Sequence, residues 1–148
     1  MHLILTILLL ITACNEQETQ RQESILFGNW KLISFVNQST NTIISENDFL
    51  NSNQITITFN KELNFNGNTI INNFAGAYFI NESNKLITFL NFSSTEVNET
   101  AWGELFYQSL NSNYIRQTRN WENTYDITQE NILKIFYSEQ EYMTLEKL

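Results

Sequence analysis

The stretch ITITF at residues 55–59 alternates apolar and polar side chains without interruption. A period of two places Ile55, Ile57 and Phe59 on one face of an extended chain and the two threonines on the other. One face of such a strand packs into a core while the other stays in water. The stretch therefore predicts a half-buried strand of an antiparallel sheet.

Turn and strand signals continue downstream of this stretch. Asn60-Lys61-Glu62 predicts a turn, after which Leu63 and Phe65 resume the alternation up to Asn66-Gly67, a pair favoured in tight turns. Further strands are expected at residues 77–80, 86–92, 114–118, 124–128, 132–137 and 142–145.

The domain opens with a β-rich segment upstream, ILFGNWKLISFV at residues 25–36. Alternation places Trp30, Leu32 and Ser34 of this segment on one face. Residues 37–53 are polar and rich in Asn and Ser, and we expect them to form a long connection.

The spacing of the apolar residues changes after residue 98. Positions i, i+3, i+4, i+7 and i+8 are occupied by Trp102, Leu105, Phe106, Ser109 and Leu110. This spacing predicts a helix with one face on the core, with Asn98 as its N-cap and Asn111-Ser112-Asn113 at its end. The predicted fold is mainly β, a curled antiparallel sheet or partly closed barrel with one helix packed on it.

Length and charge limit the functions that remain open. The 148 residues, 42% of them hydrophobic, suit one domain with a substantial core, and 16% charged residues is too few for a disordered chain. The net charge is -8, from 8 basic and 16 acidic residues. Such an acidic chain is not expected to bind nucleic acid or to be drawn to anionic lipid by charge.

The N-terminal residues resemble a bacterial lipoprotein signal peptide. Residues 3–12, LILTILLLIT, are uncharged, and at about 1.5 Å per residue they reach only about half the thickness of a bilayer core. The run ends in Ile11-Thr12-Ala13-Cys14, which is similar to a lipobox, although no Lys or Arg precedes it. The resemblance implies cleavage before Cys14 and lipid on its thiol, which would anchor the protein in the membrane. The alternative is a buried N-terminal strand or helix of a cytoplasmic protein.

This interpretation divides the chain into a signal peptide at residues 1–13, a lipid-anchored polar tether at 14–23 and a folded domain at 24–148. The residue after Cys14 is Asn15 and not the Asp that retains lipoproteins in the inner membrane of enteric bacteria. The expected location is therefore the bacterial cell envelope, at the outer membrane.

Cleavage before Cys14 would also limit the chemistry of the mature chain. His2 would be lost and the one Cys lipidated, which excludes Ser-His-Asp and Cys-His relays and ordinary zinc, copper or haem sites. Neither a cofactor nor a metal is expected. Three carboxylates, Glu96, Glu99 and Glu104, leave open a hydrolase of envelope glycans. The other interpretation places them on the exposed side and first turn of the helix.

The order of these elements resembles the META domain family, which includes heat-inducible bacterial lipoproteins. The resemblance covers residues 27–147. The segments that resemble its motifs are residues 28–30 for G-x-W, 57–59 for an L-T-F-like strand, 71–78 for G-C-N followed by G-x-Y, with the first G lost, 94–98 for S/T-T-x-M-A-C, and 104–110 for E-x-x-F/Y-x-x-x-L.

Both cysteines of the META pattern are missing here, around Ile71 and Asn98, so no thiol role carries over. The matching residues are expected to be structural: Gly76 through its backbone conformation, Asn72 by capping a turn and Tyr78 by a packed ring and hydrogen-bonded hydroxyl. The full matching set is Gly28, Trp30, Phe59, Asn72, Gly76, Tyr78, Thr95 and Glu104.

The Gly28-x-Trp30 opening also resembles lipocalin-like lipoproteins. That alternative implies a carrier of a small hydrophobic ligand, with an apolar cavity inside a barrel. The helix in the middle of the domain favours the META resemblance, because lipocalins place their helix near the end.

The leading hypothesis is a non-enzymatic envelope lipoprotein with an accessory or stress-related role. It would be held at the membrane by the lipid on Cys14 and act by contact with an envelope component, an envelope protein among them. Trp121, in a polar stretch at residues 119–123, is the candidate contact residue, and a ring folded back on the strands is the alternative.

Overall fold

The computed structural model describes residues 25–50, 54–69, 71–95, 97–129 and 131–148. The expected signal peptide and tether lie outside these residues, as does Glu96. In chain order the elements are β1 (Gly28–Asn37), β2 (Thr42–Ser45), the 3-10 helix η1 (Glu46–Asp48), β3 (Thr56–Phe59), β4 (Asn64–Asn68), β5 (Asn73–Asn81), β6 (Leu86–Ser94), α1 (Ala101–Asn111), β7 (Tyr114–Ile115), β8 (Asn120–Thr128), β9 (Ile132–Phe136) and β10 (Glu141–Lys147).

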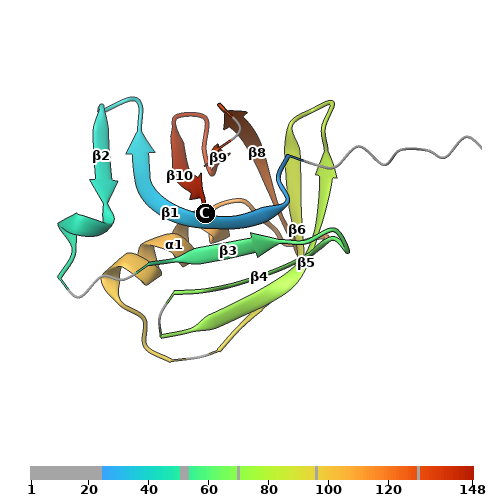
Figure 1. Ribbon diagram of the computed structural model, residues 1–148, viewed down its shortest axis with the longest axis horizontal. Coiled ribbons are helices and arrows are strands. Elements are labelled where there is room, and N and C mark those ends of the chain that lie inside the picture. The colour runs from blue at the N-terminus through green and yellow to red at the C-terminus, as the bar shows by residue number, and fades with distance from the viewer. Residues whose placement is uncertain (1–24, 51–53, 70, 96, 130) are drawn as a thin grey trace, which may run out of the picture.

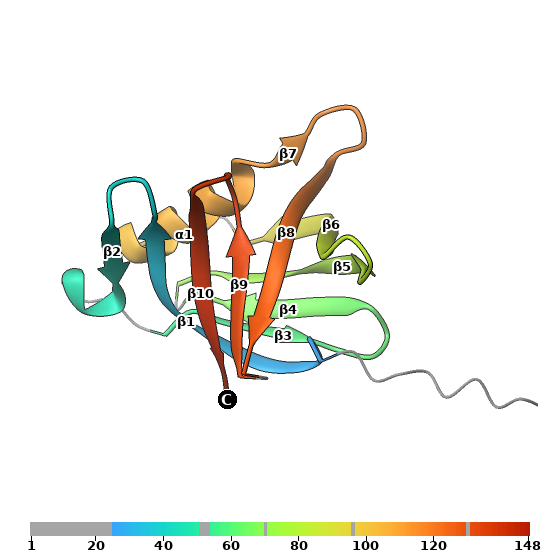
Figure 2. The same cartoon turned by 90° about the horizontal axis from the view of Figure 1, so that it is seen from above.

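Eight of the described strands close into an antiparallel barrel (Figures 1 and 2). Their order is β1-β3-β4-β5-β6-β8-β9-β10, and β10 pairs again with β1. Closure gives each barrel strand two neighbours and removes exposed sheet edges. The mainly β fold with one helix packed on it is confirmed. Two smaller differences concern single segments. The connection expected at residues 37–53 contains the strand β2 and the helix η1, and the strand expected at residues 114–118 is limited to the two residues of β7.

Strand β1 bends and pairs with two different strands along one of its edges (Figure 1). Residues 28–31 pair with β3 and residues 34–37 with β2, while β10 runs along the other edge. The register against β10 shifts between Leu32 and Ser34, and a bulge of this kind disturbs the alternation of side chains that follow. Phe35, 3% exposed, therefore enters the core, and the expected place of Ser34 on the Trp30 face is wrong.

Asn66-Gly67 does not form the expected turn. Both residues lie inside β4, opposite Ala75 and Phe74 of β5. A Cβ on Gly67 would lie 2.4 Å from Cζ of Phe74 and 2.1 Å from the Thr56 carbonyl oxygen. The glycine thus leaves room for the Phe74 ring, and this tertiary requirement outweighs the local preference of the dipeptide for a turn.

Helix α1 begins after Thr100, so the expected N-cap at Asn98 is wrong. The Thr100 hydroxyl accepts a hydrogen bond from the Gly103 amide at 3.1 Å. The segment before the helix is held against the start of β5, because the backbone of Val97 is hydrogen-bonded to the Asn72 side chain. The helix therefore begins only after this segment. The predicted apolar face is correct: Trp102, Phe106, Ser109 and Leu110 are buried and Leu105 is half-buried.

The helix covers one end of the barrel. The Trp102 ring lies 5.1 Å from the Phe35 ring and the Phe106 ring 5.2 Å from the Phe74 ring, centre to centre. Phe35 is near the end of β1 and Phe74 near the start of β5, and antiparallel order brings these positions to the same end of the barrel. At the opposite end, Nε1 of the buried Trp30 donates to the Leu26 carbonyl at 2.8 Å.

Aromatic rings pack inside the barrel. Phe59 meets Tyr78 at 5.0 Å and Phe65 meets Phe89 at 5.1 Å, both edge to face. Such geometry is favoured by the ring quadrupoles. The rings thus take up space in which the lipocalin-like alternative predicts a ligand cavity. The largest fully buried side chains are Trp30, Trp102, Tyr78, Phe59, Phe65, Phe89, Phe106, Leu26, Leu32, Ile55, Ile87 and Leu133.

Candidate functional site

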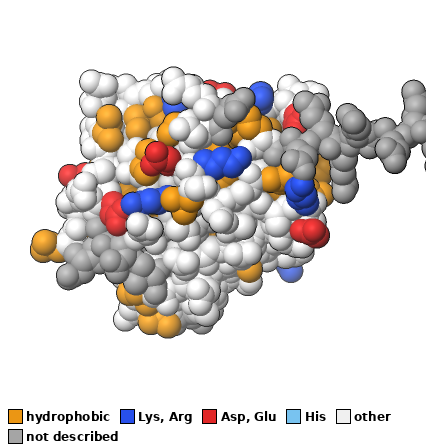
Figure 3. All heavy atoms as spheres, in the orientation of Figure 1, with side chains coloured by type: hydrophobic (Ala, Val, Ile, Leu, Met, Phe, Trp, Pro, Cys, Tyr) orange, Lys and Arg blue, Asp and Glu red, His pale blue; other side chains and the backbone are white. Residues whose placement is uncertain are grey.

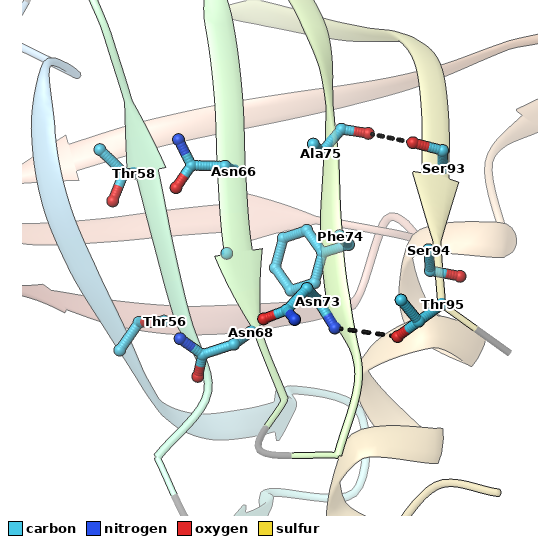
Figure 4. A pocket seen from close by; sticks show the side chains of 11 residues that line it. Thr56, Thr58, Asn66, Asn68, Asn73, Phe74, Ala75, Ser93, Ser94 and Thr95 are labelled. Atoms are coloured by element: carbon cyan, nitrogen blue, oxygen red, sulfur yellow. Dashed lines mark hydrogen bonds between the residues drawn. The ribbon is translucent and has the colours of Figure 1, made fainter. Parts of the chain in front are cut away.

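A groove runs over the outer face of the wall formed by β3, β4, β5 and β6 (Figure 4). It has a volume of about 550 Å³ and is lined by Thr56, Thr58, Asn66, Gly67, Asn68, Asn73, Phe74, Ala75, Ser93, Ser94 and Thr95. None of these lining residues is charged. The lower part of the molecule in the space-filling view, where β4 and β5 lie, is almost free of charged side chains (Figure 3).

The groove follows from the alternation of side chains along these strands. Phe65 and Phe74 point into the core, and the neighbouring Asn66 and Ala75 face outward. Cross-strand pairing sets Asn66 between Thr58 and Ala75. Because the Ala75 side chain ends at Cβ, the surface is hollow between its longer neighbours.

Gly76 keeps β5 close to β6 beneath the groove. A Cβ on Gly76 would lie 2.7 Å from the Leu90 carbonyl oxygen and 2.7 Å from Cε1 of Phe65. Its φ is not in the left-handed region, where Gly28 alone of the glycines lies, at 129°. A glycine is therefore needed at position 76 because a side chain would not fit. The sequence predicted that Gly76 supplies a backbone conformation closed to other residues, but that conformation occurs at Gly28 instead.

The groove offers unpaired amide and hydroxyl groups. Ser93 is engaged, since its hydroxyl donates to the Ala75 carbonyl at 3.2 Å (Figure 4). Within the described residues, the lining side chains that make no hydrogen bond are Thr56, Asn66, Asn68 and Asn73. Amides and hydroxyls both donate and accept, so the groove can bind an uncharged polar molecule by hydrogen bonds.

A hydrogen-bond network around the buried Asn72 closes one end of the groove. Asn72, 3% exposed, donates from Nδ2 to the Val97 carbonyl and to Oε2 of Glu99, both at 2.8 Å. Its Oδ1 accepts from the Thr95 hydroxyl at 2.8 Å and from the Val97 amide at 2.9 Å. All four hydrogen-bonding positions of the side-chain amide are thereby used, and the network joins the start of β5 to the segment that leads into α1.

This network unites two residues of the META resemblance, Asn72 and Thr95, in a structural role. It also holds together the segments around Ile71 and Asn98, where the META pattern has the cysteines that this sequence lacks. The sequence pointed to both segments, but the contact between them is seen only in the folded chain.

Glu99 is a hydrogen-bond acceptor in this network. Besides the Asn72 amide, the Thr69 hydroxyl and the Thr100 amide, the latter at 2.8 Å, donate to it. Burial raises the pKa of Glu99, but these hydrogen bonds favour its charged form more strongly and hold the pKa below the usual value. The general acid of a glycosidase needs a raised pKa, so Glu99 is unsuited to that role.

Glu104 does not join Glu99 in the network. Its side chain is exposed and accepts a hydrogen bond from Nε2 of Gln108 at 3.1 Å, on the outer side of α1. Among the residues that the structure describes, no group of three or more His, Cys, Asp or Glu is arranged to hold a metal ion.

Tyr78 belongs to the core and closes the barrel end opposite α1. Its hydroxyl donates to the Asn60 carbonyl at 2.8 Å. Burial, and then the charge of Glu62, raises the pKa of Tyr78 to about 12, so the hydroxyl stays protonated and remains a donor. Trp30 and Phe59, which also match the META pattern, are buried in the same core.

Trp121 is half-buried and lies against other rings. Its ring centre is 5.0 Å from that of Tyr114 and 5.6 Å from that of Phe92. Its Nε1 donates to Oδ1 of Asn111, at the end of α1, at 3.0 Å. The ring is thus folded back on the strands, which was the alternative to an exposed contact residue.

Sequence reasoning missed the residues that line the groove, apart from Thr95. A signal was present for two of them, because the alternation at residues 55–59 places Thr56 and Thr58 on the outward face of that strand. What the pattern lacks is the order of the strands around the barrel, which sets Thr58, Asn66 and Ala75 side by side.

No helix within the described ranges is long and apolar enough to cross a bilayer. No protein-family model matches the chain, and no curated protein matches it either. The META resemblance accordingly remains a prediction from the motifs.

Similar folds occur among solved structures. A DUF4847 family protein from Bacteroides vulgatus is 16% identical, with a TM-score of 0.60 over 84% of this chain and 94% of that one. A protein from Burkholderia xenovorans is 15% identical, with a TM-score of 0.58 over 84% of each chain. A lipocalin-like protein from Bacteroides uniformis is 14% identical, with a TM-score of 0.53 over 84% of this chain and 99% of that one. These likenesses show that the barrel shares its fold with a lipocalin-like protein, despite a helix in the middle of the domain.

Proposed function

We propose that this protein is a non-enzymatic lipoprotein of a bacterial cell envelope, anchored through Cys14, and that its groove binds an uncharged polar envelope component. The observation that carries the proposal is the set of unpaired amides and hydroxyls on the outer wall of the barrel. Rings fill the interior, which favours binding at the surface.

The charges of the chain support an uncharged partner. With a net charge of -8, the protein repels anionic polymers, and none of the described residues that line the groove has a carboxylate to attract a cation. Phe74, the aromatic residue of the lining, is 3% exposed and offers little surface for stacking. Hydroxyl groups of a neutral glycan are donors and acceptors of the kind that the free amides of the groove complement.

The position of the groove is compatible with a lipid anchor. The Lys147 ammonium, at the end of β10, donates to the carbonyl of Ile25 at 3.3 Å. The described chain therefore begins at the end of the barrel opposite α1. A tether from that end would leave the groove accessible on the side wall. An accessory or stress-related role at the outer membrane rests on the META resemblance and on Asn15.

Two measurements test the proposal. The intact mass of protein from its native membrane fraction is expected to correspond to a chain that begins at Cys14 and carries acyl groups, and an unlipidated chain that retains Met1 would contradict the anchor. Affinity electrophoresis of that protein through gels containing neutral envelope polysaccharide is expected to show retardation that Asn66→Lys abolishes.

The matched control is Thr128→Lys, which adds the same charge at an exposed position of β8, away from the groove. Retardation that persists in Asn66→Lys, or that disappears equally in Thr128→Lys, would refute the groove as the binding surface.

A second candidate function is carriage of a small apolar ligand. The shared fold with a lipocalin-like protein favours it. The aromatic rings inside the barrel argue against it, because they occupy the space that such a ligand would need, and the ligand would have to bind at another site.

A further inference from the structure

A second recess, of about 220 Å³, lies at the helix-covered end of the barrel. The hairpin formed by β1 and β2 stands beside α1 there (Figures 1 and 2). The recess is bounded by this hairpin, by Leu105 of α1 and by the turn between β9 and β10. We refer to it as the hairpin recess.

One side of the hairpin recess is apolar. Phe35 and Ile44 are cross-strand partners on β1 and β2, and Leu105 and Tyr137 face them from α1 and the end of β9. Ile44, Leu105 and Tyr137 are each half-buried, so part of their apolar surface remains uncovered. The Phe35 and Tyr137 rings, both of which line the recess, meet edge to face with their centres 6.3 Å apart.

The other side of the hairpin recess carries a positioned carboxylate. Asn37 and Glu141 are cross-strand partners on β1 and β10, and Nδ2 of Asn37 donates to Oε1 of Glu141 at 2.7 Å. The Ser138 hydroxyl donates to Oε2 at 3.3 Å. No lysine or arginine in the described ranges forms an ion pair with Glu141. The carboxylate is thus fixed in direction and keeps lone pairs for a further donor.

We infer that the hairpin recess binds a small amphipathic cation, with its ammonium group against Glu141 and its apolar part on Ile44, Leu105 and Tyr137. Convergence of one polar anchor and an apolar wall is the usual composition of a small-ligand site. Among the described residues the Glu141 carboxylate has no cationic partner, so a ligand ammonium supplies the opposite charge, and the Tyr137 ring offers a second, cation-π contact.

Size restricts the ligand further. The recess has a volume of about 220 Å³. This is enough for a single ring or a short alkyl chain bearing an amine and too little for a lipid. An anionic ligand would be repelled by Glu141. The inference rests neither on the groove nor on the lipid anchor.

Calorimetric titration of the full-length protein with phenethylammonium, in zwitterionic nanodiscs and with empty nanodiscs subtracted, tests the inference. Saturable binding at one site is expected, and 2-phenylethanol, which keeps the ring but lacks the charge, should bind at least about ten-fold more weakly. Glu141→Gln should weaken phenethylammonium binding by about ten-fold. Ile44→Trp, which fills the recess, should abolish it.

Matched controls lie next to both residues. Glu139→Gln removes a neighbouring exposed carboxylate, and Ile43→Trp adds the same ring on the opposite face of β2, where Ile43 is 67% exposed. Neither should change the affinity. If Ile44→Trp fails to fold, the affinities of Glu141→Gln and Glu139→Gln for phenethylammonium are compared, and this comparison alone tests the inference.

Absence of saturable binding, equal affinity for the alcohol, or an unchanged affinity in Glu141→Gln would overturn the inference. Asn66→Lys, which disables the groove, should leave amine binding intact. Failure of the recess can therefore be told apart from failure of the proposed function.

Discussion

Replacing Asn72 by alanine removes four hydrogen bonds at once and tests the network that closes the groove. The side-chain amide binds the Val97 carbonyl and amide, the Thr95 hydroxyl and the Glu99 carboxylate. In Asn72→Ala these four groups lose a partner, and the start of β5 is no longer tied to the segment that precedes α1.

The cost can be worked out from the exposure of each group. The bonds to the Thr95 hydroxyl and to the Val97 backbone are part-buried, so water partly replaces the amide there and each lost bond costs about 0.5 kcal/mol. The bond to Glu99 is charge-assisted and part-buried, and its loss costs about 1.5–2 kcal/mol. A total of about 3 kcal/mol is expected, which lowers the melting temperature of a domain of this size by about 10 °C.

Urea unfolding followed by tryptophan fluorescence measures this loss, with an unchanged slope as the check that unfolding remains two-state. Asn73→Ala is the matched control, because that neighbouring amide makes no side-chain hydrogen bond within the described residues and its loss should cost less than about 0.5 kcal/mol. A cost for Asn72→Ala as small as that of the control would refute the structural interpretation of Asn72.

The remaining predictions concern three other positions. Gly67→Ala should destabilise the protein by about 3 kcal/mol in the same assay, because the added Cβ collides with Thr56 and Phe74; unchanged stability would mean that this ring can move aside. The hydrogen bonds to Glu99 hold its pKa in the folded protein below the usual value of 4.5. The charged carboxylate therefore stabilises the fold at any pH above 4.5, and this contribution is lost as the pH falls through the pKa of the folded state. The stability advantage of the wild type over Glu99→Gln should therefore shrink as the pH falls below 4.5, and a constant difference would contradict this sign. Trp121→Ala should cost about 2 kcal/mol because the ring is packed, whereas full stability with loss of an envelope phenotype would make it a contact residue.

The buried face of a single strand or helix could be predicted from the spacing of its apolar residues. The alternation at residues 55–59 and the helical spacing from Trp102 to Leu110 identified the buried faces correctly, because side chains repeat every 2 residues along a strand and every 3.6 along a helix. The mainly β fold followed from the number of such strands and the one helix.

Predictions failed where a neighbouring element changed the local preference. Asn66-Gly67 has the composition of a turn, yet the Phe74 ring needs the space under Gly67 and the pair remains in β4. Ser34 continues the alternation of β1, yet the bulge against β10 turns Phe35 inward in its place. Neither requirement is visible in the residues that it affects.

The sequence by itself determined the period, the apolar faces and the charge of each element, and from these the fold class. The tertiary structure alone decided which elements are neighbours. The groove requires four strands in the order β3-β4-β5-β6, and the hairpin recess requires β1, β2, α1 and β10 at one end of the barrel. Both sites arise from contacts between residues far apart in the chain, and barrel closure, a property of the whole sheet, brings those residues together.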